Sequence, residues 1–261
     1  MSLLRVGEIL AAIDRRAPFS SAAEWDAVGL QIGDPEREVS AVAVVHELTT
    51  RLLDGIISVG AELVVTYHPL LFHPLNSVTA VPGAEGRVFA LVEGRVAVIS
   101  VHTNWDAAPG GSSDSLAAAL EIQDSEGFAA SMTGAGDEVW FGRCGAFDGS
   151  VGDLADLVQA RLGVRPRLSG PLDRVVRRVA VLPGSGGSQV AEAVSAGVDA
   201  YVTGDVSHHE ARRAADSGMV VVDAGHAPTE RPGVRALYDL VSGIGDVPVE
   251  LVGGDDNPWG L

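Results

Sequence analysis

A repeated pattern constrains this chain more than any other feature: short, valine-rich apolar runs each end in a polar loop. The clearest runs cover residues 40–45, 63–66, 96–101, 199–203 and 219–222. Such runs are typical of strands that are buried on both faces of a sheet. Segments with helical spacing lie between several of them, which predicts right-handed crossovers and parallel sheets. From residue 142 the pattern begins again, and this predicts two related α/β lobes rather than one barrel.

Residues that can bind metal ions or transfer protons follow each of these strands. They are His46 and Glu47, Tyr67 and His68, His102 and Asp106, Asp205 with His208 and His209, and His226 with Glu230. Open α/β sheets place their ligand sites at the carboxyl ends of parallel strands. The alternative is a set of histidines scattered over surface loops, which the recurrence after strand upon strand disfavours. We therefore predict a convergent site, provided that the strands share a sheet edge or face one another.

The segment 225–233 is the most informative of these loops. Its two prolines, Pro228 and Pro232, favour a helix that begins near Glu230 over one that runs through it. A carboxylate at a helix amino end stays ionised, and together with the neutral imidazole of His226 it suits a divalent first-row metal. By itself, the spacing also fits a surface histidine followed by a glutamate that caps a helix.

Length and composition indicate a soluble globular protein. The 261 residues suffice for one α/β domain or two, and no apolar stretch approaches the roughly 20 residues of a membrane span. Apolar residues from Leu3 to Ile13 are interleaved with charged ones, which predicts an amphipathic helix. A signal peptide would have a uniformly apolar segment instead, so we expect a cytoplasmic protein. Cys144 is the only cysteine, so any metal must be bound by His, Asp and Glu.

The net charge of −17 at pH 7 bears on the choice of partners. Nonspecific binding to nucleic acid depends on Lys and Arg side chains that neutralise phosphates, so this charge disfavours a nucleic-acid regulator. An acidic pocket would favour cations, although solubility explains most of the 35 acidic residues.

Three shorter segments carry further predictions. In 183–188, the glycines either cradle a phosphate or form a plain turn, and no complete phosphate-binding fingerprint is present. Trp25 and Leu30 are predicted to anchor the core around a glycine-rich turn, while Asp26 either supports a site residue or caps the turn. The tail 256–259 is predicted to pack against the protein.

Together, these loops resemble the NIF-three-like family, whose bacterial members are often labelled GTP cyclohydrolase type-two homologues. The resemblance spans nearly the whole chain and depends on the segments 24–30, 67–72, 102–106, 203–209 and 225–230, in this order. It implies two related α/β lobes with mainly parallel central sheets. The first lobe would comprise residues 1–125 and 226–261 with most metal ligands, and the second 126–225. The resemblance further implies a homohexameric ring with a dinuclear metal centre. Histidine and carboxylate ligands suit Zn, Fe and Mn alike.

Four residues match metal ligands of the family: His68, Asp106, His226 and Glu230. Tyr67 departs from the family, which commonly has a pair of histidines where this chain has Tyr67 and His68. A phenol, with a pKa near 10, is a poor ligand unless the metal itself ionises it. Tyr67 is therefore either a ligand at a weakened metal site or a wall of the pocket, and we favour the wall.

The favoured function is a metal-dependent hydrolase that acts on a nucleotide or a similar small heterocycle. Two divalent ions flanked by Glu230 and Asp106 would activate water, and purine-ring opening follows from the family label alone. The alternative is a non-enzymatic ring that binds metal for storage, delivery or partner recognition. His46 is assigned only a structural role, and His73 a peripheral one. The predicted catalytic residues are Glu230, His102, Asp205 and His208.

Overall fold

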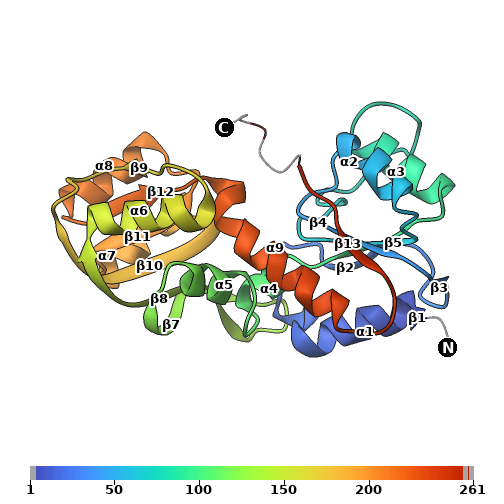
Figure 1. Ribbon diagram of the computed structural model, residues 1–261, viewed down its shortest axis with the longest axis horizontal. Coiled ribbons are helices and arrows are strands. Elements are labelled where there is room, and N and C mark those ends of the chain that lie inside the picture. Colours follow the sequence, from blue (N-terminus) through green and yellow to red (C-terminus); the bar gives the residue numbers. More distant parts are fainter. Residues whose placement is uncertain (1–3, 255–257, 259–261) are drawn as a thin grey trace. The chain divides into compact units, whose positions relative to one another are not determined.

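The computed structural model describes residues 4–254 and residue 258, which form two compact units (Figure 1). Unit one comprises 4–109, 133–135 and the described residues of 234–258, and unit two comprises 110–132 and 136–233. The units change at 109/110 and 233/234, whereas the expected lobes changed at 125/126 and 225/226. His226 and Glu230 consequently lie in unit two, because the helix that carries them begins directly after a strand of that unit.

Unit one is built on a five-stranded sheet of order β13-β4-β5-β6-β2, in which only β2 and β6 are antiparallel neighbours. The strands of unit one are β1 (Leu4–Arg5), β2 (Gly29–Ile32), β3 (Glu38–Val39), β4 (Val42–Val45), β5 (Leu63–Thr66), β6 (Ala97–Ser100) and β13 (Val249–Leu251). Its helices are α1 (Val6–Arg16), η1 (Phe19–Ser21), α2 (Thr50–Ser58), α3 (Ala84–Glu93), α4 (Thr103–Ala107) and the second half of α9 (His226–Ser242).

Both faces of this sheet are covered by helices. The central strands consist of Val, Ile, Leu, Ala, Thr and Ser, and successive side chains point to opposite faces. One face packs against α1 and α9 through side chains such as Ile9 and Leu237. The other packs against α2 and α3 through Ile56 and Leu91, on the side where Figure 1 places these two helices. Unit one is therefore a three-layer α/β/α sandwich.

Unit two is built on a six-stranded mixed sheet of order β7-β8-β10-β11-β12-β9. Its strands are β7 (Gln123–Met132), β8 (Glu138–Ser150), β9 (Arg167–Leu168), β10 (Val175–Ser185), β11 (Ala200–Gly204) and β12 (Val220–Asp223). Its helices are α5 (Ser112–Ala119), α6 (Val151–Leu162), η2 (Gly187–Gln189), α7 (Val190–Ser195), α8 (His208–Asp216) and the first half of α9. Side chains of α5 and α6 cover one face of the sheet, and those of α7 and α8 cover the other.

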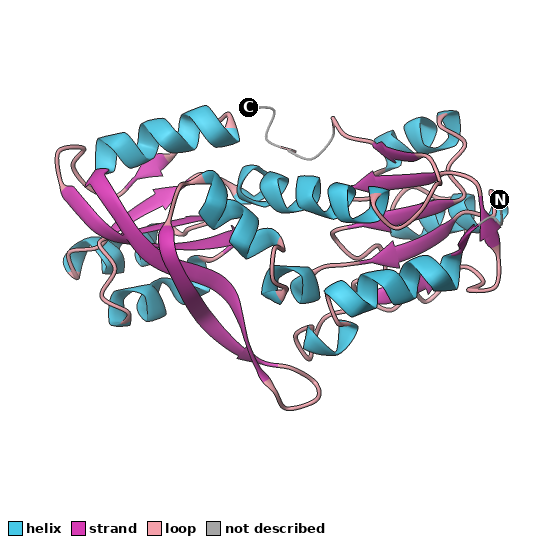
Figure 2. Ribbon diagram, turned by 60° about the horizontal axis from the view of Figure 1, so that its bottom comes forward, coloured by secondary structure: helices cyan, strands magenta, loops and turns pink. Residues whose placement is uncertain are grey.

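The predicted α/β fold with parallel strands is confirmed in each unit. In unit two, the parallel neighbours are β10, β11 and β12, while β7, β8 and β9 join them antiparallel. The long twisted hairpin of β7 and β8, prominent in Figure 2, was not predicted. Its strands contain glycine and charged residues and lack the valine-rich runs that mark the other strands.

The start of helix α9 corrects one prediction. The helix begins at His226 and contains Pro232, whereas the sequence favoured a start near Glu230. Pro228 is tolerated because it lies in the first turn, where backbone N–H groups have no acceptor within the helix. Pro232 removes one bond, to the carbonyl of Pro228, at a cost of about 3 kcal/mol. Burial of side chains such as Leu237 offsets this loss.

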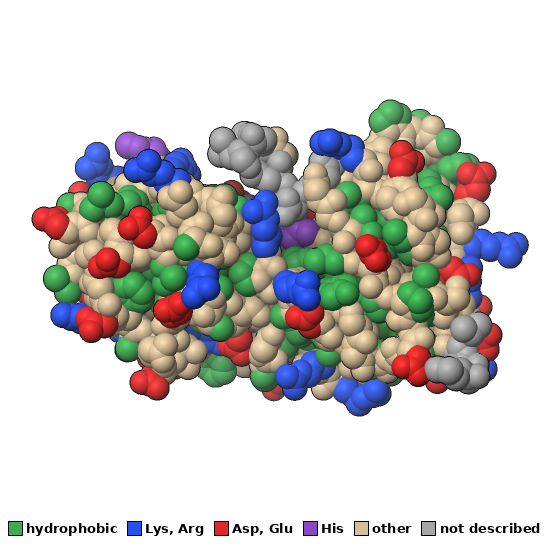
Figure 3. Space-filling view, in the orientation of Figure 1, with side chains coloured by type: hydrophobic (Ala, Val, Ile, Leu, Met, Phe, Trp, Pro, Cys, Tyr) green, Lys and Arg blue, Asp and Glu red, His purple; other side chains and the backbone are tan. Residues whose placement is uncertain are grey.

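Other predictions concern the surface and the terminus. Trp25 is not a core anchor, because 61% of it is exposed, whereas Leu30 packs against the core of unit one. Of the tail 256–259, all but Pro258 lies outside the described residues. In Figure 3, acidic side chains are interspersed with basic ones over the visible face, as the solubility interpretation expects. Among the described residues, no helix combines the length and apolarity needed to cross a membrane.

Candidate metal site

In unit one, the ends of neighbouring parallel strands bring histidines together. Val45 of β4 is in register with Thr66 of β5. The backbone N–H of His68 donates to the carbonyl of His46 over 2.9 Å, so the pairing extends beyond both strands. On the other side of β5 lies β6, which ends two residues before His102. The three histidines therefore leave the sheet at the same edge.

The rings of His46, Tyr67, His68 and His102 form one cluster. The centroid of the His68 ring lies 4.7 Å from that of His46 and 5.1 Å from that of His102. The rings of His46 and Tyr67 are stacked, with centroids 5.8 Å apart and planes at 14°. The Tyr67 hydroxyl donates a 2.6 Å hydrogen bond to Oδ1 of Asp106, and both residues are buried. Three imidazoles and a carboxylate thus gather around one phenol.

Asp26 holds His102 in place. Its Oδ1 lies 2.9 Å from Nδ1 of His102, and its Oδ2 accepts hydrogen bonds from the backbone N–H and the hydroxyl of Thr103 at 3.0 and 2.5 Å. Burial by itself would raise the pKa of Asp26, but the hydrogen bond and charge of His102 and the bonds from Thr103 hold that pKa below its usual value. Asp26 is therefore an anion that supports a site residue, which was one of the two roles left open for it.

An exposed aromatic pair borders His102. The rings of Trp25 and Phe72 meet edge to face with centroids 6.0 Å apart, and Trp25 lies 6.2 Å from the ring of His102. Trp25 is 61% exposed and Phe72 43% exposed. The pair therefore presents exposed aromatic rings beside the polar cluster.

In unit two, the first turn of α9 presents a histidine and a carboxylate on one face. His226 and Glu230 are one helical turn apart, and Nε2 of His226 lies 3.2 Å from Oε1 of Glu230. The other ring nitrogen, Nδ1, lies 2.7 Å from Oδ2 of Asp205. Asp205 has a left-handed backbone with φ of 56°, a strained conformation that Asp tolerates better than most residues. This strain is consistent with a functional position.

Gly184, in the glycine-rich segment, leaves room for these side chains. Its φ is +71°, and a Cβ placed there would lie 2.3 Å from Oε1 of Glu230 and 3.4 Å from Nε2 of His226. Its backbone N–H donates to the hydroxyl of Thr229 over 2.9 Å. The segment thus packs tightly on the start of α9, and this accounts for glycine at position 184.

The loops on either side of this pair are tied together by Asp223. Its Oδ2 accepts the backbone N–H of Val206 at 3.2 Å, and its Oδ1 accepts that of Gly225 at 3.0 Å. Asp223 is buried and also forms an ion pair with Arg167. It was not predicted as a site residue, because it reads in the sequence as the end of an apolar strand.

The electrostatics of unit two favour a cation. Burial by itself would lower the pKa of His226, but the hydrogen bonds and charges of Glu230 and then Asp205 outweigh burial and raise the pKa to about 9. The same negative charges that favour a proton on this ring also attract a metal ion to the site beside it. At pH 7 the ring of His226 is therefore protonated, not neutral as expected from the sequence, and a metal ion would bind it by displacing a proton. Imidazole and carboxylate donors suit divalent first-row metals, so the residues present fit such an ion.

Most predicted site residues fall into these two clusters. Unit one holds His68, His102, Asp106 and Tyr67, and unit two holds His226, Glu230 and Asp205. His208 is exposed at the start of α8, where its ring meets that of His209 edge-on. His46 was assigned a structural role, yet within unit one it lies beside His68 as a candidate metal ligand. Its signal in the sequence was its position directly after a buried strand.

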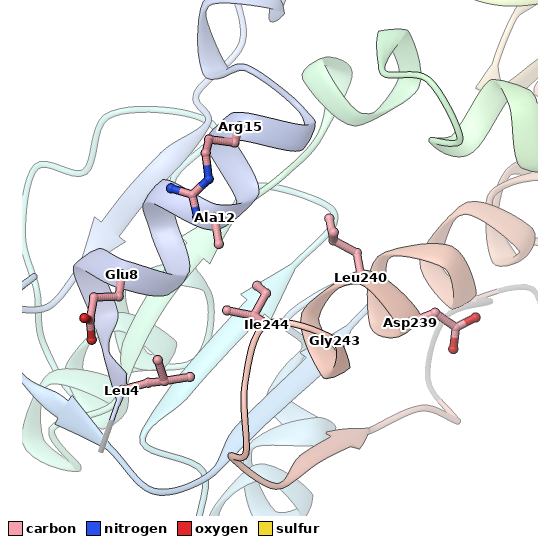
Figure 4. A pocket seen from close by; sticks show the side chains of 8 residues that line it. All are labelled: Leu4, Glu8, Ala12, Arg15, Asp239, Leu240, Gly243 and Ile244. Carbon is pink, nitrogen blue, oxygen red and sulfur yellow. The ribbon is translucent and has the colours of Figure 1, made fainter. Parts of the chain in front are cut away.

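A separate hollow of about 570 Å³ lies between α1 and the second half of α9 (Figure 4). Its lining includes Leu4, Ala12, Leu240 and Ile244, with Glu8 and Arg15 at α1. None of the residues that line it is a predicted site residue. The hollow is therefore separate from both polar clusters.

Similar proteins agree with this architecture. A protein of Streptomyces coelicolor named GTP cyclohydrolase 1 type 2 homolog is 33% identical over 266 residues, covering 98% of this chain and 93% of its own. A homolog of the same name from Clostridium perfringens is 27% identical, covering 95% of each chain. The crystal structure of a Bacillus cereus protein related to NIF3 matches the fold with a TM-score of 0.90 at 23% identity, covering 99% of each chain.

Reduced HcgD from Methanocaldococcus jannaschii has a TM-score of 0.83 at 27% identity and covers 97% of this chain and 100% of its own. The family described as Duf34/NIF3 (NGG1p interacting factor 3) matches residues 4–258. That match covers all but the ends of the chain and includes every strand and helix described above. This chain belongs to the Duf34/NIF3 family.

Proposed function

We propose that this chain binds divalent metal ions and uses them to hydrolyse a nucleotide or a similar small heterocycle. The observation that carries the proposal is the gathering of imidazoles and carboxylates at strand ends in unit one and at the start of α9 in unit two. A bound divalent ion would act as a Lewis acid and lower the pKa of water. The ligands proposed from the family resemblance are His68, Asp106, His226 and Glu230, for two ions of Zn, Fe or Mn.

The residues around these ligands are suited to proton transfer. An ionised Asp26 accepts a hydrogen bond from the Nδ1–H of His102, which favours the tautomer whose proton is on Nδ1. A histidine held in one tautomer in this way is a good general base. Asp205, with 45% of its side chain exposed, contacts both solvent and Nδ1 of His226.

A planar substrate is supported by Trp25 and Phe72. Aromatic side chains that are exposed beside a polar site offer a face on which a heterocyclic ring can stack. Relatives named GTP cyclohydrolase 1 type 2 homolog point to a purine nucleotide as the first compound to try. We propose GTP and its purine analogues as the substrate class.

Turnover assays on metal-loaded protein test this function. The chain is loaded with Zn²⁺, Mn²⁺ or Fe²⁺ and incubated with GTP and related nucleotides, and products are separated by chromatography. We expect turnover that disappears on chelation and falls at least about 100-fold in Glu230→Gln, because that change removes a proposed ligand. Metal binding without any turnover would contradict the hydrolase.

That last result would favour the second candidate, a non-enzymatic metal-binding ring for storage, delivery or partner recognition. The family description, NGG1p interacting factor 3, favours it because it names a protein partner for a relative. For either function, we propose a homohexamer that acts in the cytoplasm and binds neither membranes nor nucleic acid. Light scattering on the purified chain tests the assembly, and a mass of one chain would contradict it.

A further inference from the structure

His46 is the one histidine of the unit-one cluster to which no chemical role was assigned. It is buried, and one of its ring nitrogens lies within 4.8 Å of a ring nitrogen of His68. Their ring centroids are 4.7 Å apart, with planes at 72°. Two imidazoles at this separation can bind the same ion after small side-chain rotations, because each metal–nitrogen bond is about 2.0–2.1 Å long.

Strand register fixes where His46 points. Because Val45 pairs with Thr66, the next pair along the parallel strands is His46 with Tyr67, and the Tyr67 N–H donates to the carbonyl of Val45 over 3.0 Å. Register partners on neighbouring strands project to the same face of a sheet. The stacked rings of His46 and Tyr67 confirm this relation. His46 therefore presents an imidazole one strand away from Tyr67, on the same side.

Tyr67 is less suited than His46 to bind a metal ion. Its hydroxyl donates a hydrogen bond to Oδ1 of Asp106 over 2.6 Å. To become a ligand, the phenol would have to give up this hydrogen bond and bind through its oxygen. The His46 imidazole binds through the lone pair of a ring nitrogen, and its ring lies close to that of His68.

We propose that His46, and not Tyr67, supplies the second imidazole ligand beside His68. Tyr67 is a positioning residue that orients the carboxylate of Asp106. This assignment depends on the proposed function in one respect, namely that the chain binds a divalent metal. It moves the second ligand from the residue after β5 to the residue after β4, on the same face of the sheet.

Titration of metal-free protein with Co²⁺ tests the assignment, because the visible absorption of Co²⁺ reports its ligands. We compare wild type with His46→Ala and His46→Gln, with Tyr67→Phe, and with the control His73→Ala, which changes an exposed histidine of the same unit. Circular dichroism of each metal-free variant checks folding, and His46→Gln preserves side-chain volume if the alanine variant does not fold.

We expect both His46 variants to bind Co²⁺ more than about 100-fold more weakly and to shift its absorption bands. Loss of a residue that only orients a ligand typically weakens binding by 10–100-fold, so Tyr67→Phe should stay within that range with its bands unshifted. The double variant His46→Val, Tyr67→His should recover binding to within about 10-fold of wild type, because it returns an imidazole to the neighbouring strand.

Other outcomes would overturn the assignment in distinguishable ways. Wild-type affinity and unshifted bands in the His46 variants would remove His46 as a ligand and leave the proposed function standing. Band shifts in Tyr67→Phe with none in His46→Gln would make the phenol the ligand. Absence of Co²⁺ binding by wild type would overturn both this assignment and the proposed function.

Discussion

The hydroxyl of Tyr67 donates a 2.6 Å hydrogen bond to Oδ1 of Asp106 in the buried interior of unit one. The sequence left two roles open for Tyr67: a metal ligand or part of the wall of the pocket. The hydrogen bond to Asp106 supports the second role. The interaction also has a measurable energetic consequence.

Tyr67→Phe removes a hydrogen bond to a buried carboxyl group. We expect the free energy of unfolding to fall by about 1.5–3 kcal/mol, since hydrogen bonds to charged groups are worth about that much. Tyr201→Phe is a matched control in unit two, because its buried hydroxyl donates to the backbone carbonyl of Gly186 over 3.0 Å. It should cost only about 0.5–1.5 kcal/mol. Urea denaturation measures both, and equal losses would contradict a charged Asp106.

Gly184→Ala should disturb unit two through Glu230. The left-handed backbone costs alanine about 1–2 kcal/mol, and the clash of its Cβ with Oε1 of Glu230 adds about 1–3 kcal/mol. Gly163→Ala is the control: its φ is +75°, but nothing lies within 4 Å of the added Cβ, so only the backbone cost applies. Thermal melting compares the two variants. Equal destabilisation would show that Gly184 does not make room for Glu230.

Trp25→Ala should weaken the binding of a nucleotide to the metal-loaded protein. Stacking of a base on an aromatic side chain is worth about 1–3 kcal/mol, which corresponds to a loss of about 5–150-fold in affinity. Trp140→Ala is the control, because Trp140 is a partly exposed tryptophan in unit two. Calorimetric titration with GTP measures the affinities, and an unchanged value in Trp25→Ala would exclude stacking on this residue.

Glu62 should make the stability of unit one depend on pH. Hydrogen bonds from the backbone and hydroxyl of Ser40, together with Arg37, hold the pKa of Glu62 below its ordinary value of 4.5. A carboxyl group with a depressed pKa stabilises the fold above its unfolded pKa, and this contribution is lost as the pH falls through the folded pKa. Denaturation at several pH values should therefore show Glu62→Gln to be less stable than wild type at pH 7, with the difference shrinking as the pH falls below 4.5 and vanishing below the folded pKa of Glu62. A difference that grows in acid would contradict this sign.

Much of the fold could be predicted from the sequence because buried parallel strands carry a strong local signal. Strand 63–66 has the predicted bounds. The β7–β8 hairpin could not be predicted, since its alternation is interrupted by glycines and charges. The start of α9 was misplaced because local rules for proline do not include the tertiary packing that compensates for Pro232.

The site was predictable in its residue types more than in its contacts. Polar residues follow five predicted strands, and this pattern identified His68, His102 and Asp106. The role proposed for His46 depends on the register of β4 against β5, which no local pattern specifies. The exposure of Trp25 could not be predicted either, because an aromatic residue beside a glycine-rich turn has the same local sequence whether it is buried or exposed.

The most direct test of the central claim is the number of metal ions per chain, measured by elemental analysis. The protein is purified without chelator or affinity-tag metal, as wild type, His68→Ala and Glu230→Ala, with His209→Ala as a control for an exposed histidine on α8. Our account predicts two divalent ions per chain in wild type and in the control, with metal lost from both His68→Ala and Glu230→Ala. Wild-type protein without metal, or variants that keep all of it, would contradict the account.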